Sequence, residues 1–266
     1  NDSDVIYSGD IAKWKKFANS LKLKIAVRIG NTSAATTAAA GAFTSNADNA
    51  TISYEGSTPN TNPLLVSLVQ SGRNDFVPAN TIVDELNSLE DPRRSVFFDD
   101  NITPYKGGTY GDSNSYALYT HIGEAMLEPT FRGVLLDYAE VEFLMATANI
   151  GSASSHYEAG IIASFENWGV AGANDYITKP EVAFSQDNLG KQFWIAMYNR
   201  GFEGWSVYRM FDGAITFNLP ADTGNPIPTR FTYPVNEQTL NETNFDAASA
   251  AIGGDTQTTK IFWDIN

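Results

Sequence analysis

Four tyrosines stand among glycine, asparagine and serine residues between positions 93 and 130, where their rings could contact a ligand. They are Tyr105, Tyr110, Tyr116 and Tyr119. An aromatic ring stacks on the apolar C–H face of a sugar, and an asparagine amide both donates to and accepts from hydroxyl groups. Asn101 and Asn114 lie in the same segment, so the sequence indicates a ligand-binding site of Tyr and Asn side chains. The alternative is that these rings fasten the segment to the rest of the protein.

Paired carboxylates are a second possible chemistry, because two of them flanking a glycosidic bond can hydrolyse it. Glu140 and Glu142 lie on one expected helix but point about 200° apart, so they cannot share one side of a cleft. Glu124, Glu128 and Asp137 near the tyrosine-bearing segment are further candidates. Three functions therefore remain open: a binding protein, a helical glycoside hydrolase and a purely structural adaptor.

Other catalytic chemistries find little support. The chain has no cysteine, which excludes thiol catalysis, zinc–thiolate sites and disulfides. His121 and His156 are the two histidines, no G-x-S-x-G motif accompanies them, and each is expected to make an ordinary hydrogen bond. The glycine-rich residues 107–111 do not match a phosphate-binding loop, and Asp99 and Asp100 lack the spacing of a calcium loop. We expect no catalytic residue, metal or cofactor.

The composition excludes further classes of protein. The 266 residues carry a formal net charge of −14, which opposes binding to nucleic acid. A chain of this length with 42% hydrophobic residues can bury a core without disulfides or metals. It contains no run of about 18 apolar residues, so no membrane-spanning helix is expected.

The opening helix carries the strongest pattern in the chain. Asp10 is a good N-cap, the helix is expected to run to about residue 29, and Gly30 follows as a stop signal. Apolar residues recur at spacings of three and four along one face, and they are Ile11, Trp14, Ala18, Leu21 and Ile25. Its lysines are interpreted as a solvated polar face.

Further short helices meet at Gly or Asn, two by two, which is typical of stacked helical hairpins. They are expected over residues 33–44, 63–71, 80–89, 132–150, 152–168, 186–199 and 202–211, with a pair within 236–252. Residues 45–62 and 93–130 are expected to be mostly irregular. Five aromatic residues at helical positions are assigned to the core, and they are Trp14, Phe143, Phe193, Trp194 and Trp205.

A series of sequence blocks resembles the SusD/RagB family. The first block is YSGDIAKWKKFANSLKLK at residues 7–24. The others follow in family order, and they are Asp91-Pro92-Arg93, YAEVEFL at 138–144, YEAGI at 157–161, QFWIA at 192–196, EGWSVYR at 203–209, PTRFTYPVNE at 228–237 and residues 253–264. Each block is weak by itself, but together they extend over the whole chain.

The resemblance implies a mainly α fold, an α–α superhelix of tetratricopeptide-type helix pairs with long irregular loops, in one domain over residues 1–266. It implies a binding protein and no enzyme: a lipoprotein on the extracellular face of the outer membrane of Bacteroidota that captures glycans or similar nutrients and delivers them to a SusC-like TonB-dependent transporter. Ligand residues vary within the family, so none is assigned by motif. The matching blocks imply packing roles instead, with Trp14, Tyr138 and Trp205 in the core and Arg209 and Arg230 as buried hydrogen-bonding anchors.

The chain also departs from the family. Members are nearly twice as long and begin with a lipid-bearing cysteine, which is absent here. We therefore expect this chain to correspond to the later part of the family fold, with an N-terminal part and the lipid anchor missing. Membrane contact would come through that anchor alone. Part of a superhelix should expose an apolar face. A glycan, a glycopeptide and a peptide all remain possible ligands.

Overall fold

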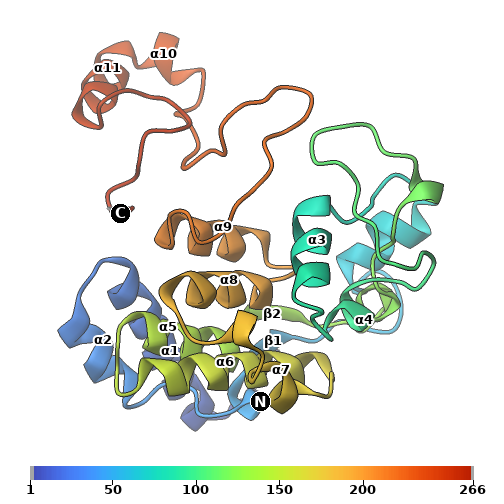
Figure 1. The fold of residues 1–266 in the computed structure, drawn as a ribbon. Coiled ribbons are helices and arrows are strands. Elements are labelled where there is room, and N and C mark those ends of the chain that lie inside the picture. The colour runs from blue at the N-terminus through green and yellow to red at the C-terminus, as the bar shows by residue number, and fades with distance from the viewer. Residues whose placement is uncertain (1–2, 265–266) are drawn as a thin grey trace.

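The computed structural model describes residues 3–264, which form helices packed in consecutive pairs with long irregular segments between them (Figure 1). The α-helices are α1 (Ile11–Arg28), α2 (Thr32–Ala39), α3 (Asn80–Ser88), α4 (Arg94–Phe97), α5 (Tyr138–Thr147), α6 (Ala153–Trp168), α7 (Ala173–Tyr176), α8 (Gln186–Ala196), α9 (Gly201–Met210), α10 (Glu237–Leu240) and α11 (Glu242–Ala251). Short 3₁₀ or π turns are η1 (Asn46–Asp48), η2 (Leu65–Gln70), η3 (Tyr116–Leu118), η4 (Glu124–Leu127) and η5 (Pro180–Val182), and the strands are β1 (Ala50–Ile52) and β2 (Gly133–Leu136). The mainly α architecture predicted from the sequence is confirmed.

Helix α5 lies at the centre of the packed helices, between α1 and α8 in sequence and in space (Figure 1). All its residues from 139 to 146 are buried, because α6, α1 and α8 pack against different sides of it. Phe143 of α5 stacks on Phe193 of α8 with ring centroids 5.2 Å apart, and both rings are buried as predicted. The pairs α1–α2, α5–α6 and α8–α9 therefore build one continuous core.

Local capping explains where the main helices begin and end. The Asp10 carboxylate accepts hydrogen bonds from the backbone N–H groups of Ala12 and Lys13 at 2.9 and 3.1 Å, which starts α1 as predicted. Ser152 caps α6 in the same way, and Gly169 ends it at a φ of +68°, where a residue without a Cβ is favoured.

The helix predicted over residues 132–150 is wrong in its first part. Residues 133–136 form β2, which pairs antiparallel with β1 so that Leu136 lies opposite Ala50. Asp137 then caps α5 by accepting a hydrogen bond from the backbone N–H of Glu140 at 2.9 Å. The apolar residues before Asp137 also fit a helical period, and the partner strand lies far earlier in a segment expected to be irregular. Pattern alone therefore does not reveal the pairing.

Two other helices differ from expectation in extent or type. Helix α2 ends at Ala39 instead of residue 44, and a Cβ on Gly41 would lie 2.5 Å from Asn19 Nδ2, so the chain passes close to α1 there. The helix expected over residues 63–71 is present, but residues 65–70 of it form a π-helix, and none of its side chains is buried.

The apolar stripe of α1 faces solvent. Ile11 is 70% exposed and Ile25 is 53% exposed, whereas Leu23 and Lys24 on the opposite side are buried. Lys24 enters the interior because its ammonium lies 2.7 Å from Glu140 and 2.8 Å from Glu203. The exposed stripe agrees with the apolar face expected of a partial superhelix.

The core assignment is wrong for some of the tryptophans. Trp14 is 39% exposed, and its indole Nε1 donates a hydrogen bond to Asp4 at 2.7 Å. Trp205 is half-buried and lines a groove, whereas Trp194 lines the same groove but also packs against the core as predicted. Tyr138 is also half-buried but packs against the core.

The predicted arginine anchors are confirmed. Arg209 donates from Nη1 to the Thr229 carbonyl oxygen at 3.0 Å, and Arg230 pairs with Asp255 at 2.6 Å. Both side chains are buried; Arg209 joins α9 to the segment that follows it, and Arg230 joins that segment to the residues after α11. None of the helices within residues 3–264 is long and apolar enough to cross a membrane.

Candidate functional site

A groove of about 640 Å³ is lined by residues of α3, of α8 and α9 and of the long segment that follows α9. We call it the aromatic groove, and it is lined by Ala79, Thr81, Ile82, Tyr110, Trp194, Met197, Tyr198, Asn199, Gly201, Gly204, Trp205, Phe217, Ile227, Pro228 and Phe231. Its volume falls within the roughly 300–1,000 Å³ of small-molecule sites in proteins. The groove is therefore large enough to hold a ligand.

Trp205 is held firmly in this groove. Its Nε1 donates a hydrogen bond to the Pro228 carbonyl oxygen at 2.6 Å, and the Arg209 guanidinium lies 4.0 Å from its ring centroid. The edge of Phe231 meets the ring at a centroid distance of 5.3 Å. An aromatic ring fixed in this way offers contact area without a large loss of side-chain entropy on binding.

Gly201 and Gly204 of α9 leave space beside the second indole of the groove, that of Trp194. A Cβ on Gly204 would lie 3.5 Å from Trp194 Cδ1, an ordinary van der Waals contact, and a Cβ on Gly201 would meet nothing within 4 Å. Phe217 packs edge-on against Trp194 with centroids 5.4 Å apart. The sequence analysis placed both tryptophans in the core and missed the aromatic groove, because helical spacing does not show that one edge of a half-buried ring stays open.

The aromatic groove is uncharged. None of its fifteen lining residues is Asp, Glu, Lys, Arg or His, although the chain as a whole has a net charge of −14. Its polar side chains are Thr81, Tyr110, Tyr198 and Asn199. Aromatic walls with a few hydroxyl and amide groups suit a neutral, hydroxylated ligand whose C–H faces stack on the rings.

Of the six predicted ligand residues, Tyr110 lines the aromatic groove, where its side chain is 43% exposed. Its backbone N–H donates to Asn80 Oδ1 at 3.2 Å, and its carbonyl oxygen accepts from the N–H of Ala221 at 3.0 Å. These bonds join the 93–130 segment to α3 and to the segment after α9.

Two more of the predicted tyrosines make contacts inside the 93–130 segment. The Tyr105 hydroxyl donates to Asp100 at 3.0 Å, and burial together with this carboxylate raises the pKa of Tyr105. The Lys106 ammonium lies 4.7 Å from the ring centroid of Tyr119. Both contacts lie within the segment itself, and Tyr105 in addition packs against the core, as the alternative interpretation expects of these rings.

Tyr116 lies elsewhere, stacked on His121 with ring centroids 3.7 Å apart. Both residues line a second pocket of about 290 Å³ together with Asp99 and Glu124. His121 Nε2 lies 3.0 Å from the carbonyl oxygen of Tyr116, which is the ordinary hydrogen bond expected of this histidine.

The two predicted asparagines use their amides within the segment. Asn101 donates to the Tyr119 carbonyl oxygen at 3.0 Å and accepts from the backbone N–H of His121 at 2.9 Å. Asn114 accepts from the N–H of Thr109 at 2.8 Å and donates to its carbonyl oxygen at 2.9 Å. Both amides therefore shape the loop that presents Tyr110.

The carboxylates of α5 point in different directions, as predicted. Glu140 pairs with Lys24 and Arg200, whereas Glu142 lies 2.5 Å from His156 Nδ1. Within residues 3–264, no group of three His, Asp or Glu side chains gathers as it would around a metal ion.

Comparison with known proteins gives this geometry a context. The profile of a SusD-like family described as "Starch-binding associating with outer membrane" matches residues 1–234. No curated protein matches the chain significantly in sequence.

Solved structures share the fold. A SusD homolog from Bacteroides uniformis is 27% identical, with a TM-score of 0.85 over 99% of this chain and 67% of the other. A chitin-binding SusD homolog from Flavobacterium johnsoniae is 25% identical, with a TM-score of 0.81 over 100% and 66%. A third structure, a chitin-binding protein, is 27% identical with a TM-score of 0.79 over 99% and 67%.

The chain spans about two thirds of the length of these solved proteins, so the expectation that members are nearly twice as long is wrong for them. The helical superhelix implied by the sequence blocks is confirmed by their common fold. Because the family profile covers most of the chain, and because the fold agrees, this protein belongs to the SusD-like family of starch-binding, outer-membrane-associated proteins.

Proposed function

We propose that this protein captures an oligosaccharide in the aromatic groove at the extracellular face of the outer membrane and delivers it to a SusC-like TonB-dependent transporter. The observation that carries the proposal is a 640 Å³ groove that presents two indoles and no charged side chain. The family description and the chitin-binding proteins of the same fold support a glycan as the ligand.

The expected affinity is modest. Stacking and a few hydrogen bonds give dissociation constants from millimolar to micromolar, about 4 to 8 kcal/mol. Weak capture suits a protein that must release its ligand to a transporter. A stable complex with that transporter requires an interface of at least about 1,000 Å², and a lipid anchor would keep the two proteins in one membrane.

Calorimetric titration with chitin and starch oligosaccharides tests the proposal. We expect a Trp205→Ala variant to lose about five- to tenfold in affinity, because one stacking ring contributes on the order of 1–1.4 kcal/mol. Trp14→Ala is the matched control, since this tryptophan is also partly exposed but lies on α1, outside the groove. Unchanged affinity in both Trp205→Ala and Trp194→Ala would overturn the assignment of the groove.

Glycoside hydrolysis is the second candidate function, and one observation favours it. Asp99 and Glu124 line the same 290 Å³ pocket, beside Tyr116 and His121. A hydrolase would release reducing ends from the oligosaccharides, and Glu124→Gln would abolish that release. We expect no release from either protein; turnover that depends on Glu124 would replace the capture role.

A further inference from the structure

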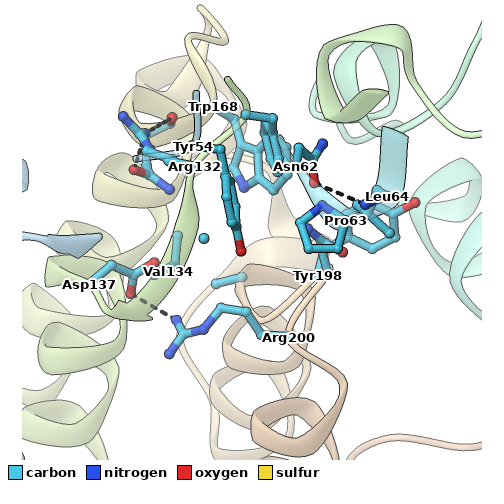
Figure 2. Close-up of a pocket in the computed structure, with 15 residues that line it drawn as sticks. Tyr54, Asn62, Pro63, Leu64, Arg132, Val134, Asp137, Trp168, Tyr198 and Arg200 are labelled. Atoms are coloured by element: carbon cyan, nitrogen blue, oxygen red, sulfur yellow. Dashed lines mark hydrogen bonds and ion pairs between the residues drawn. The ribbon is translucent and has the colours of Figure 1, made fainter. Parts of the chain in front are cut away.

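A smaller pocket of about 260 Å³ shares the lining residues Tyr198 and Asn199 with the aromatic groove. We call it the polar pocket; Figure 2 shows it, and its lining includes Tyr54, Arg132, Asp137, Trp168 and Arg200. It lies below the roughly 300–1,000 Å³ typical of independent small-molecule sites. Its size therefore suits one part of a larger ligand.

The turn between α8 and α9 separates the two pockets. Tyr198 and Asn199 line both of them, so a single residue layer divides the polar pocket from the aromatic groove. Asn199 is exposed and has a φ of +62°, a conformation that asparagine tolerates well. A chain passing from one pocket to the other would therefore pass Asn199, which lines both.

The walls of the polar pocket combine rings with hydrogen-bonding groups. Figure 2 shows the Tyr54 ring reaching down into the pocket, with its hydroxyl oxygen toward Arg200 and with Trp168 beside it. At the rim, Arg132 Nη2 donates to the carbonyl and side-chain oxygens of Asn167 at 2.8 and 2.6 Å, which fixes the guanidinium. Rings with fixed donors are the features that bind and orient one sugar ring.

The floor of the polar pocket is balanced in charge. Arg200 pairs with Asp137 and Glu140, and Lys24 also pairs with Glu140. Glu203 completes the cluster by pairing with Lys24 and Arg28, so three cations face three carboxylates. Of these residues only Arg200 and Asp137 line the pocket, where they pair with each other, and the third charged lining residue, Arg132, is bonded to Asn167. A charged ligand group would have to displace these bonds, which favours an uncharged ligand.

We propose that the polar pocket is a subsite for the terminal ring of an uncharged oligosaccharide whose preceding rings stack in the aromatic groove, with the sugar chain crossing the α8–α9 turn at Asn199. This inference rests on the proposed function for its ligand. It adds that binding depends on chain length and that Tyr54 contacts the end of long chains only.

Titration of the protein with chitin oligosaccharides from disaccharide to hexasaccharide tests this subsite. We expect affinity to rise with length, and Tyr54→Ala to weaken hexasaccharide binding about tenfold while disaccharide binding is unchanged. Trp205→Ala should weaken both. Tyr54→Phe keeps the ring and removes the hydroxyl, so it should lose less affinity than Tyr54→Ala and serves as the conservative control.

Methyl NMR of the same titrations gives a second readout. Leu64 and Val134 report on the polar pocket, whereas Ile82 and Ile227 report on the aromatic groove. The hexasaccharide should shift both sets of signals and the disaccharide the groove set alone. A hexasaccharide that shifts the groove set alone, or equal effects of Tyr54→Ala on short and long chains, would overturn the subsite but leave the proposed function intact. Failure of every oligosaccharide to bind would overturn both.

Discussion

The role of each aromatic or amide side chain depends on whether its binding groups are already used inside the protein. Asn101 and Asn114 both bond backbone atoms of their own segment, and Tyr105 donates to Asp100. Trp205 also bonds internally, through Nε1 to Pro228, yet its ring still lines the groove. Residue type alone therefore does not distinguish a ligand contact from a loop fastener.

The ionisation of the Asp4 carboxylate also depends on its hydrogen-bond partners, and we therefore expect the stability of the folded state to change with pH. Trp14 Nε1 and the backbone N–H groups of Tyr7, Gly9 and Ile6 donate to its carboxylate, which lowers the pKa of Asp4 from 3.8 to about 2. Because the folded state favours the ionised form, this stabilisation is complete above about pH 4 and is lost as the pH falls through about 2.

Thermal melts of the wild type and an Asp4→Asn variant check this effect. The variant should have the lower Tm at pH 7, and the difference should shrink steadily below pH 4. A difference that stays constant down to pH 2 would show that the carboxylate charge is not what stabilises this turn.

At the scale of elements, α1 has two faces with opposite burial. Leu23 and Lys24 are buried on one side of the helix, whereas the apolar stripe that includes Ile11 and Ile25 is exposed. The two faces should therefore respond differently to the same kind of truncation.

Urea unfolding of Leu23→Ala and Ile25→Ala measures that difference. Leu23 is fully buried, so its truncation should cost about 2–5 kcal/mol of unfolding free energy through lost contacts and a cavity. Ile25 is 53% exposed, and its truncation should change the free energy by about 0.5 kcal/mol or less. Equal costs would mean that another surface covers the stripe in solution.

At the scale of the whole molecule, Arg93 ties together segments far apart in sequence. Its fully buried guanidinium pairs with Asp91 at 2.6 Å and donates to Ser164 of α6 at 3.0 Å and to Gln192 of α8 at 2.7 Å. Arg93 in turn lowers the pKa of Asp91. The ion pair with Asp91 is local, and the two hydrogen bonds of Arg93 join the segment between α3 and α4 to α6 and α8.

Removing one partner of this pair should be severe. Arg93→Ala should cost about 3–5 kcal/mol of unfolding free energy, because it leaves the Asp91 charge buried and uncompensated. Arg73 and Asp75 form an exposed pair at 2.5 Å, and Arg73→Ala is the matched control with an expected cost of about 0–1 kcal/mol. The Asp91→Ala/Arg93→Ala double variant should lose less than the sum of the single variants; strict additivity would contradict direct pairing.

Helix type and many helix limits were determined by the sequence itself, because they depend on neighbouring residues. Asp10 and Ser152 start helices, and Gly169 ends one, through bonds or φ angles within a single turn. The sequence blocks that resemble the SusD/RagB family likewise indicated the superhelical fold.

Only the tertiary structure shows which residues meet in the candidate site. Tyr110, Trp194, Trp205 and Phe231 come from four separate parts of the chain and meet in one groove, as β2 meets β1 and Lys24 meets Glu140. The physical reason is that burial and side-chain contacts depend on distant segments, which periodicity along one helix or strand cannot specify.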